Sequence, residues 1–129
     1  MRRLLDTNAV IAMLRGQAGV ISRLRAHAPG DIGVSAVVIH ELYYGAFRSV
    51  RVEANVARVD RLRFEVVAFE REDARAAGAV RAALATAGAA IGPYDVLIAG
   101  QALARGVTLV THNLREFVRV KGLLLEDWE

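Results

Sequence analysis

The stretch Arg3-Leu4-Leu5-Asp6-Thr7-Asn8 begins the chain with an apolar run that ends abruptly on an acid. The run predicts a short buried strand over residues 3–5. Helical apolar spacing over residues 9–14 predicts that a helix follows, closed by a glycine. Asp6 is therefore expected where a strand gives way to a helix. A carboxylate at that place either binds a cation, with Thr7 and Asn8 orienting it through hydrogen bonds, or caps the helix.

Strands and helices alternate outward from this stretch. Further helices are predicted over residues 18–28, 36–47, 52–62, 70–86 and 93–104, and further strands over residues 32–34, 65–69, 107–110 and 123–125. The alternation predicts one α/β domain over residues 1–129, with a central, mainly parallel sheet in a three-layer α/β/α arrangement. In such folds ligands gather beyond the carboxyl ends of the strands.

Composition limits the function classes without choosing one. Hydrophobic residues make up 54% of the 129 positions, enough for one buried core. The net charge of +3 favours acidic partners such as nucleic acid. Lys121 is the only lysine among 17 basic residues. The arginines suit phosphate oxygens, but a coding bias explains their number equally well.

Cysteine is absent, which excludes disulfides and thiolate metal sites and fits the cytoplasmic location that we expect. The N-terminal apolar run is not a signal peptide, because Asp6 and Asn8 interrupt it. Between Arg81 and Arg105 the only charged residue is Asp95, so this segment is long enough to suggest a membrane span. Its Gly92-Pro93 break predicts two short helices instead, and we expect no membrane association.

Glu41 lies in Ala36-Val37-Val38-Ile39-His40-Glu41-Leu42-Tyr43-Tyr44, a helix that is apolar around most of its circumference and that follows Ser35, a good N-cap. An ionised carboxylate in a buried helix needs a partner. Arg48, two helical turns away, could be that partner. A metal ion would satisfy the same need, and the sequence leaves both options open.

Asp95 opens another apolar helix, where an acid is also favourable next to the helix dipole. Glu116 follows the strand at residues 107–110 and the turn Thr111-His112-Asn113. Glu116 is a candidate fourth ligand, or an exposed acid that pairs with Arg115 or Arg119.

The acids matter most as a set, since each is expected at a strand end or a helix start. If they converge at about 5 Å in an effective dielectric of about 20, each like-charged pair costs about 3 kcal/mol. Such a cluster needs a positive partner. Oxygen ligands suit Mg²⁺ or Mn²⁺, the ions with which two-metal nucleases activate water.

Four motifs resemble the PIN domain family and, within it, the VapC-like ribonuclease toxins of type II toxin–antitoxin systems. They are Leu4-Leu5-Asp6-Thr7-Asn8, Ser35 to Gly45, Ile91 to Ala99, and Val110 to Phe117; the ending Leu123 to Trp128 also matches. Many family members carry the fourth acid nearer the Thr-x-Asn of the last motif. Here Asn113 holds that place and Glu116 follows three residues later.

The resemblance implies a parallel-sheet fold and endonucleolytic cleavage of RNA that depends on Mg²⁺ or Mn²⁺. By motif position it makes Asp6, Glu41 and Asp95 metal ligands and catalytic residues, with Glu116 a catalytic acid for a second metal. It also implies a cognate antitoxin whose tail blocks the acidic pocket, and toxin homodimers. We further expect five polar residues to hydrogen-bond the metal-binding acids or to contact phosphate: Thr7, Asn8, Ser35, Thr111 and Asn113.

Histidines, arginines and tyrosines are expected to lie outside the ligand set. The three histidines are expected to be structural or surface residues, and the arginines at 48, 51 and 58 to be a solvated helix face or an RNA path. Tyr43 and Tyr44 are expected to pack in the core, with stacking on bases as the alternative. An aspartyl-phosphate phosphatase is disfavoured, because Asn8 replaces its usual second acid and Lys121 is poorly placed. A structure-specific DNA nuclease on the same fold, or a non-catalytic partner-binding module, stays open.

Overall fold

The computed structural model describes all 129 residues and contains a five-stranded, entirely parallel sheet in the order β3-β2-β1-β4-β5. The strands are β1 (Arg3–Leu5), β2 (Ile32–Ser35), β3 (Glu65–Val67), β4 (Thr108–Val110) and β5 (Leu125–Glu126). The predicted parallel sheet is therefore confirmed.

The strand order reverses beside β1, which pairs with β2 on one side and with β4 on the other. The chain builds β2 and β3 outward on one side of β1 and then returns to add β4 and β5 on the other side. A crevice forms at the carboxyl ends of the strands where such a sheet changes direction. Residues that directly follow β1 and β4 lie at this crevice.

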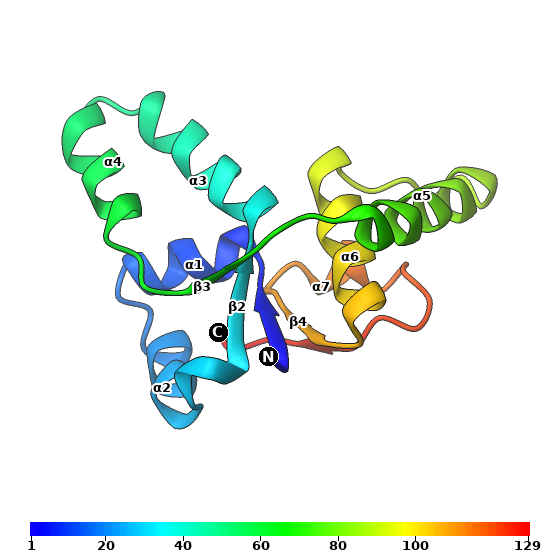
Figure 1. Cartoon of the computed structure of the whole chain (residues 1–129), viewed down its shortest axis with the longest axis horizontal. Helices are drawn as coiled ribbons and strands as arrows, with labels where there is room; N and C mark the ends of the chain where they lie inside the picture. The colour runs from blue at the N-terminus through cyan, green and yellow to red at the C-terminus, as the bar shows by residue number, and fades with distance from the viewer.

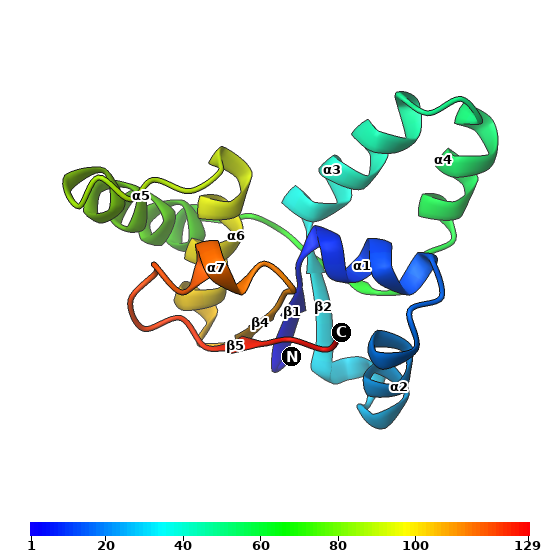
Figure 2. The same cartoon turned by 180° about the vertical axis from the view of Figure 1, so that it is seen from behind.

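Helices cover both faces of the sheet. They are α1 (Thr7–Leu14), α2 (Ala18–Ala26), α3 (Ala36–Phe47), α4 (Val52–Asp60), α5 (Arg71–Thr86), α6 (Pro93–Arg105) and α7 (Leu114–Phe117). The first four lie on one side of the strands and the last three on the other, which gives the predicted three-layer arrangement (Figure 1). The view from behind shows the same two groups (Figure 2).

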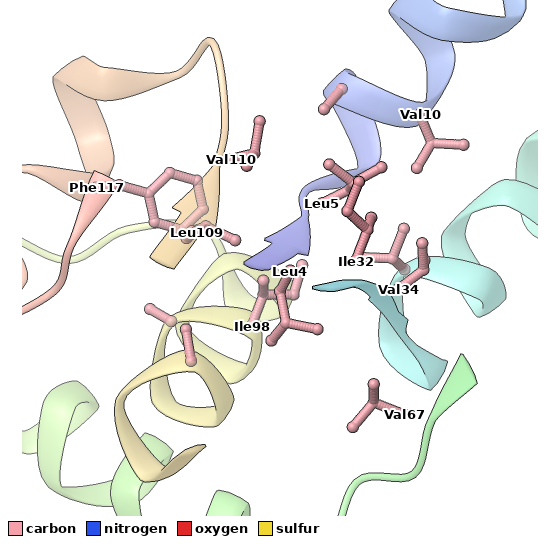
Figure 3. Close-up of a cluster of buried hydrophobic side chains, with 14 of the residues drawn as sticks. Leu4, Leu5, Val10, Ile32, Val34, Val67, Ile98, Leu109, Val110 and Phe117 are labelled. Carbon is pink, nitrogen blue, oxygen red and sulfur yellow. The ribbon is translucent and has the colours of Figure 1, made fainter. Parts of the chain in front are cut away.

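Consecutive side chains of β1 serve both layers, because neighbouring strand residues point to opposite faces. Leu4 lies against Ile98 of α6, whereas Leu5 points toward the side of α1 and Val10 (Figure 3). Both leucines are fully buried. This explains why β1 is apolar at successive positions instead of alternating.

Several element boundaries differ from the sequence prediction. Helix α1 begins at Thr7 and not at residue 9, because Asp6 is its N-cap. Helix α2 ends at Ala26, and a 3₁₀ turn, Pro29–Asp31, follows it. The two edge strands were also misplaced: β3 ends at Val67, and β5 covers Leu125–Glu126. Edge strands are bounded by pairing on one side only, and local sequence carries little signal for that.

The short helix α7 was not predicted. It has only four residues and no side-chain cap, so no periodic pattern marks it. Phe117, fully buried, anchors this turn in the core. Burial of one aromatic ring, which is a tertiary interaction, therefore places Glu116 on a helix.

The charge-poor segment before Arg105 forms parts of α5 and α6 joined by a loop, as predicted. No helix of the chain combines the length and the apolar character that crossing a membrane requires.

Helices α5 and α6 pack closely through small residues and a buried ion pair. A Cβ atom built on Gly100 would lie 2.6 Å from the Cβ of Ala77 and still closer to its backbone. Beside this contact, Arg105 donates a 3.0 Å hydrogen bond to the buried carboxylate of Asp73, to which Gln101 also donates. Burial acts to raise the pKa of Asp73, but these donors outweigh it and hold the pKa below its usual value.

We expect Gly100→Ala to destabilise the protein by about 1–3 kcal/mol, because the added methyl meets backbone that cannot move aside. Gly78→Ala is the matched control, since a Cβ at this exposed position of α5 meets nothing within 4 Å. That change should stabilise the helix by about 0.5–1 kcal/mol. Urea unfolding of both variants checks the prediction, and equal effects would contradict the close approach.

Candidate metal centre and active site

Asp6 lies at the carboxyl end of β1, in the crevice where the strand order reverses. Its side chain is only 2% exposed. One carboxylate oxygen accepts a 2.7 Å hydrogen bond from the Thr7 amide, and the other accepts a 2.8 Å bond from the Thr111 hydroxyl, just beyond β4. Asp6 caps α1, and this role is compatible with cation binding, because a carboxylate that accepts two hydrogen bonds still has free lone pairs.

Glu41 faces the same crevice from α3. The Thr7 hydroxyl donates a 3.0 Å hydrogen bond to its carboxylate. Burial is the main cause that raises the pKa of Glu41 above its usual value, and the charge of Asp6 adds to it. Arg48, the alternative partner considered for Glu41, does not pair with it. Its guanidinium donates to the Tyr44 hydroxyl at 3.1 Å and lies over that ring.

Asp95, in the first turn of α6, carries the largest electrostatic signal of the site. Its pKa is raised to about 7; burial is the largest cause, followed by the charge of Asp6, the neighbouring Glu116 carboxyl group and the charge of Glu41. Asp6, which follows β1, and the acids of α3, α6 and α7 therefore act on one another electrostatically.

Glu116 belongs to this group and is not a surface acid paired with arginine. Its carboxylate accepts a 3.1 Å hydrogen bond from the Asn113 side chain. Asn113 is held in turn by its backbone amide, which donates to the Thr111 hydroxyl at 3.0 Å. The predicted pairing with Arg115 or Arg119 is wrong, because neither arginine forms an ion pair.

No basic side chain forms an ion pair with any of the four carboxylates. Like charges in a partly buried crevice repel each other, and without a cation one of them tends to stay protonated. The raised pKa of Asp95 expresses this tendency. The cluster therefore has the electrostatic character of a cation site.

The donor set fits a hard divalent ion, because all four side chains offer carboxylate oxygen and no thiolate or imidazole competes. The set is not preassembled: no three acidic or histidine side chains are already arranged to hold a metal. Hydrogen bonds to Thr7 and Thr111 hold Glu41 and Asp6 toward neighbouring side chains instead. Metal coordination by Asp6, Glu41 and Asp95 accordingly stays a prediction.

The five polar residues expected around the acids fall into three groups. Thr7, Thr111 and Asn113 each donate a hydrogen bond to an acid of the cluster. Asn8 is exposed and its side chain has no protein partner. Ser35 is fully buried, and its hydroxyl caps α3 by accepting from the Val37 amide at 3.1 Å, so its burial argues against a phosphate contact.

The histidines lie outside the ligand set, as expected. His27 stacks on Trp128, and His40 packs against Tyr94 at 5.2 Å between ring centroids. His112 is largely exposed and lies 3.0 Å from the Asp127 carboxylate. The hydrogen bond that the His112 ring donates to the Asp127 carboxylate is the main cause that raises the pKa of His112.

The prediction that Tyr43 and Tyr44 pack in the core is wrong for Tyr44, which is 57% exposed. Tyr43 is half-buried and donates its hydroxyl to Asp60. Helix α3 buries only Val38, Leu42 and Ala46, so its apolar circumference overstated its burial. A helix that packs on one side leaves its remaining apolar residues at the surface. Arg58, predicted on a solvated face, donates to the Leu14 carbonyl.

The sequence analysis did not identify Ile11 and Arg15 as candidate functional residues. They share one face of α1 with Asn8 at helical spacing, but this spacing alone did not indicate a chemical role. In the structure they line a hollow of about 550 Å³. A second hollow of about 260 Å³ lies on the other flank of α1, toward α3 and α4, and Glu41 is among the residues that line it.

Comparison with known proteins gives consistent similarities. The family model described as PIN domain matches residues 3–123. The tRNA(fMet)-specific endonuclease VapC of Salmonella typhimurium is 38% identical over 130 residues, which cover 99% of this chain and 98% of that protein. Ribonuclease VapC2 of Haemophilus influenzae is 37% identical over 131 residues, with the same coverage of 99% and 98%.

Solved structures agree with these sequence matches. A chain in the crystal structure of DNA-bound VapBC from Salmonella typhimurium superposes with a TM-score of 0.94 at 36% identity, covering 100% of this chain and 99% of that one. VapBC2 from Rickettsia felis, bound to a DNA fragment from its promoter, gives 0.92 at 33% identity with 100% coverage of both chains. The similarity thus includes every element that carries an acid of the site.

We expect Asp95→Asn to raise the melting temperature in EDTA at pH 8. At this pH, above the pKa of about 7, the folded chain must accommodate an ionised Asp95, which the amide avoids. The pKa of Asp95 is higher in the folded chain than in the unfolded chain, so ionisation of Asp95 destabilises the fold increasingly as pH rises from about 4 to 7. The rise in melting temperature caused by Asp95→Asn should therefore be smaller at pH 5 than at pH 8.

With Mg²⁺ or Mn²⁺ present, the wild type should melt at a higher temperature than Asp95→Asn. An ion at about 100 times its Kd stabilises the wild type by about 2.7 kcal/mol, and Asp95→Asn should lose most of this gain. Glu53→Gln, an exposed acid on α4, is the control and should follow the wild type in scanning fluorimetry. Equal responses of Asp95→Asn and wild type would show that Asp95 does not contribute to the site.

Proposed function

This chain belongs to the PIN domain family, and we propose that it is a divalent-metal-dependent endoribonuclease, the toxin of a type II toxin–antitoxin pair. One observation carries the proposal: carboxylates of Asp6, Glu41, Asp95 and Glu116 act on one another in a crevice without a cationic partner. The names of its relatives, which are ribonucleases and endonucleases, support RNA as the substrate.

In the proposed mechanism Asp6, Glu41 and Asp95 would hold Mg²⁺ or Mn²⁺, and Glu116 would hold a second ion. Such an ion would supply positive charge for the phosphodiester and lower the pKa of a water molecule for in-line attack. The chain's own residues supply the orientation. Thr111 holds Asp6, Thr7 holds Glu41, and Asn113 holds Glu116, each through one hydrogen bond.

The protonation of Asp95 is the second contribution of the protein. Its pKa of about 7 means that only part of the molecules carry a proton there at neutral pH. A cation bound at this carboxylate would displace that proton, because a carboxylate ligand is deprotonated. Binding should therefore be tighter at pH 8 than at pH 6. No histidine takes part, since none of the three touches an acid of the cluster.

Transfer RNA is the first substrate to test, because a relative that is similar over the whole chain is named a tRNA(fMet)-specific endonuclease. The structure-specific DNA nuclease and the non-catalytic binding module are the competing outcomes. Both would retain the acids and the fold, so only a substrate assay separates them.

We also propose a cognate antitoxin as partner, because solved relatives at 33–36% identity are VapBC toxin–antitoxin complexes. The hollow between α1, α3 and α4 supports this. Apolar side chains, among them Leu14, Leu42 and Val59, line it, and Glu41 stands at its edge toward the crevice. A homodimer is proposed as well, and the exposed Tyr44 and Phe47 on α3 offer apolar surface for a protein contact.

We expect purified protein to cut initiator tRNA into discrete fragments with Mg²⁺ or Mn²⁺ and to be inactive in EDTA. Asp6→Asn should lower the cleavage rate at least about 100-fold, since it removes a ligand charge and keeps the shape. Asn113→Ala should cost about 10- to 100-fold, because Glu116 loses its orientation. Denaturing gels with end-labelled tRNA measure each rate.

Glu53→Gln serves as the control for altered charge and should cleave like the wild type. Circular dichroism spectra that match the wild type would show that Asp6→Asn still folds. Cleavage at the wild-type rate by Asp6→Asn would exclude Asp6 as a ligand. Cutting of single-stranded or branched DNA, with RNA left intact, would favour the DNA nuclease instead.

A further inference from the structure

A polar hollow of about 550 Å³ lies beside the acidic crevice, on the flank of α1 opposite to the apolar hollow. Helix α1 forms one wall, the turn at Gly16 and Gln17 forms one end, and the segment at His112 and Asn113 forms the other wall. The hollow is open at this end, because a Cβ atom built on Gly16 would meet nothing within 4 Å. The mechanism described above assigns no role to this space.

The hollow adjoins the site of the chemistry. Asn8 lines it and stands two residues after Asp6, while Asn113 lines it and donates a hydrogen bond to Glu116. A chain whose phosphate lies at the carboxylates therefore has its neighbouring unit at the entrance of the hollow.

Three side chains on the lining carry hydrogen-bond donors that no protein atom uses. Arg15 is exposed, and its guanidinium has neither an ion pair nor a hydrogen-bond partner. Gln17 uses its carbonyl oxygen to accept from the Val20 amide at 2.8 Å, so its NH₂ group is free. The carboxamide of Asn8 has no protein partner either. Free donors of this kind are what phosphate oxygens and base edges require.

Flat and apolar surface accompanies these donors. The His112 ring is 61% exposed, and its bond to Asp127 holds it in place. Ile11 adds an apolar side chain from α1. Unstacked RNA bases bind proteins by stacking on rings, histidine included, while polar groups read their edges. Glu129, also on the lining, lies 3.9 Å from His112 Nδ1, and its carboxylate can also accept from base amino groups.

We propose that this hollow is a subsite for one nucleotide of the RNA substrate, next to the phosphate that is cut. The base lies against His112 and Ile11, the amides of Asn8 and Gln17 contact its edge, and Arg15 contacts a backbone phosphate at the rim. The inference rests on the proposed ribonuclease function and adds to it a source of sequence preference.

The chemistry of the two hollows separates their occupants. Five of the ten residues that line the hollow toward α3 and α4 are apolar, among them Leu14, Leu42 and Val59, and the others include Asn55 and Arg58. This mixture suits a protein segment that carries both apolar and polar side chains. Most residues that line the hollow beside His112 are polar or charged, which suits a nucleotide. Ile11 and Arg15 belong to both linings, so α1 forms the ridge between them.

Fluorescence anisotropy with a labelled single-stranded oligoribonucleotide, in buffer with Ca²⁺, tests the subsite. Arg15→Gln should lower the slope of log affinity against log salt by about 0.7, the value for one phosphate contact on a single strand. Arg75→Gln is the matched control, because Arg75 is an exposed, unpaired arginine on α5 and its loss changes net charge equally.

The ring of His112 is tested separately from its charge. His112→Ala should weaken binding about tenfold, as expected for the loss of one stacked base, whereas His112→Phe should bind within about twofold of the wild type. Gln17→Ala would also remove the N-cap of α2, so Gln17→Glu is preferred: it keeps the accepting oxygen and replaces the donor NH₂ group with a negatively charged oxygen. Its affinity should fall as well.

The outcomes distinguish the subsite from the function itself. If the wild type binds and cuts RNA while the Arg15, Gln17 and His112 variants match it, the subsite is wrong and the ribonuclease assignment stands. If these variants keep RNA affinity and lose antitoxin binding, the hollow belongs to the protein partner and the proposal is overturned. If the wild type neither binds nor cuts any RNA, both proposals fail together.

Discussion

The carboxylate of Asp6 is the constraint on which the site and its neighbourhood depend. It is 2% exposed at the point where the strand order reverses, and its two oxygens accept from the Thr7 amide and the Thr111 hydroxyl. One side chain thus starts α1 and joins the ends of β1 and β4. Because an unpartnered buried carboxylate is costly, these two bonds hold the crevice in one arrangement. The charge of Asp6 acts on both Glu41 and Asp95.

Around Asp6 the fold accepts an unfavourable concentration of negative charge. Asp95 shows the consequence, since burial and three neighbouring acids raise its pKa to about 7. Elsewhere the chain pairs its buried acid: Asp73 is bonded to Arg105 and Gln101, and its pKa is lowered. The contrast between the two aspartates separates an acid that stabilises helix packing from acids that have no basic partner, which we propose to be ligands of a cation. Perturbed carboxylates in a cleft indicate function for this reason.

Helix α1 divides the surface beside the crevice into two kinds of binding surface. Its C-terminal half presents Ile11 and Arg15 to a polar hollow on one side and to an apolar hollow on the other. Both hollows adjoin the acids, one through Asn8 and Asn113 and one through Glu41. A nucleic acid and a protein inhibitor could therefore approach the same carboxylates along different flanks, and an inhibitor need not imitate RNA to block them.

The layered α/β fold, the place of Asp6 after a buried strand and the candidate acids could all be predicted from the sequence. These features follow from local apolar periodicity and from the order of motifs along the chain. Tertiary structure alone decided that Arg48 turns to Tyr44 and not to Glu41, that Tyr44 is exposed, and that Glu116 bonds to Asn113. It also decided α7, whose single turn depends on the burial of Phe117. The physical reason is common to all of these: partners far apart in the chain meet only after the sheet has brought its carboxyl edge together, and no local pattern records that meeting.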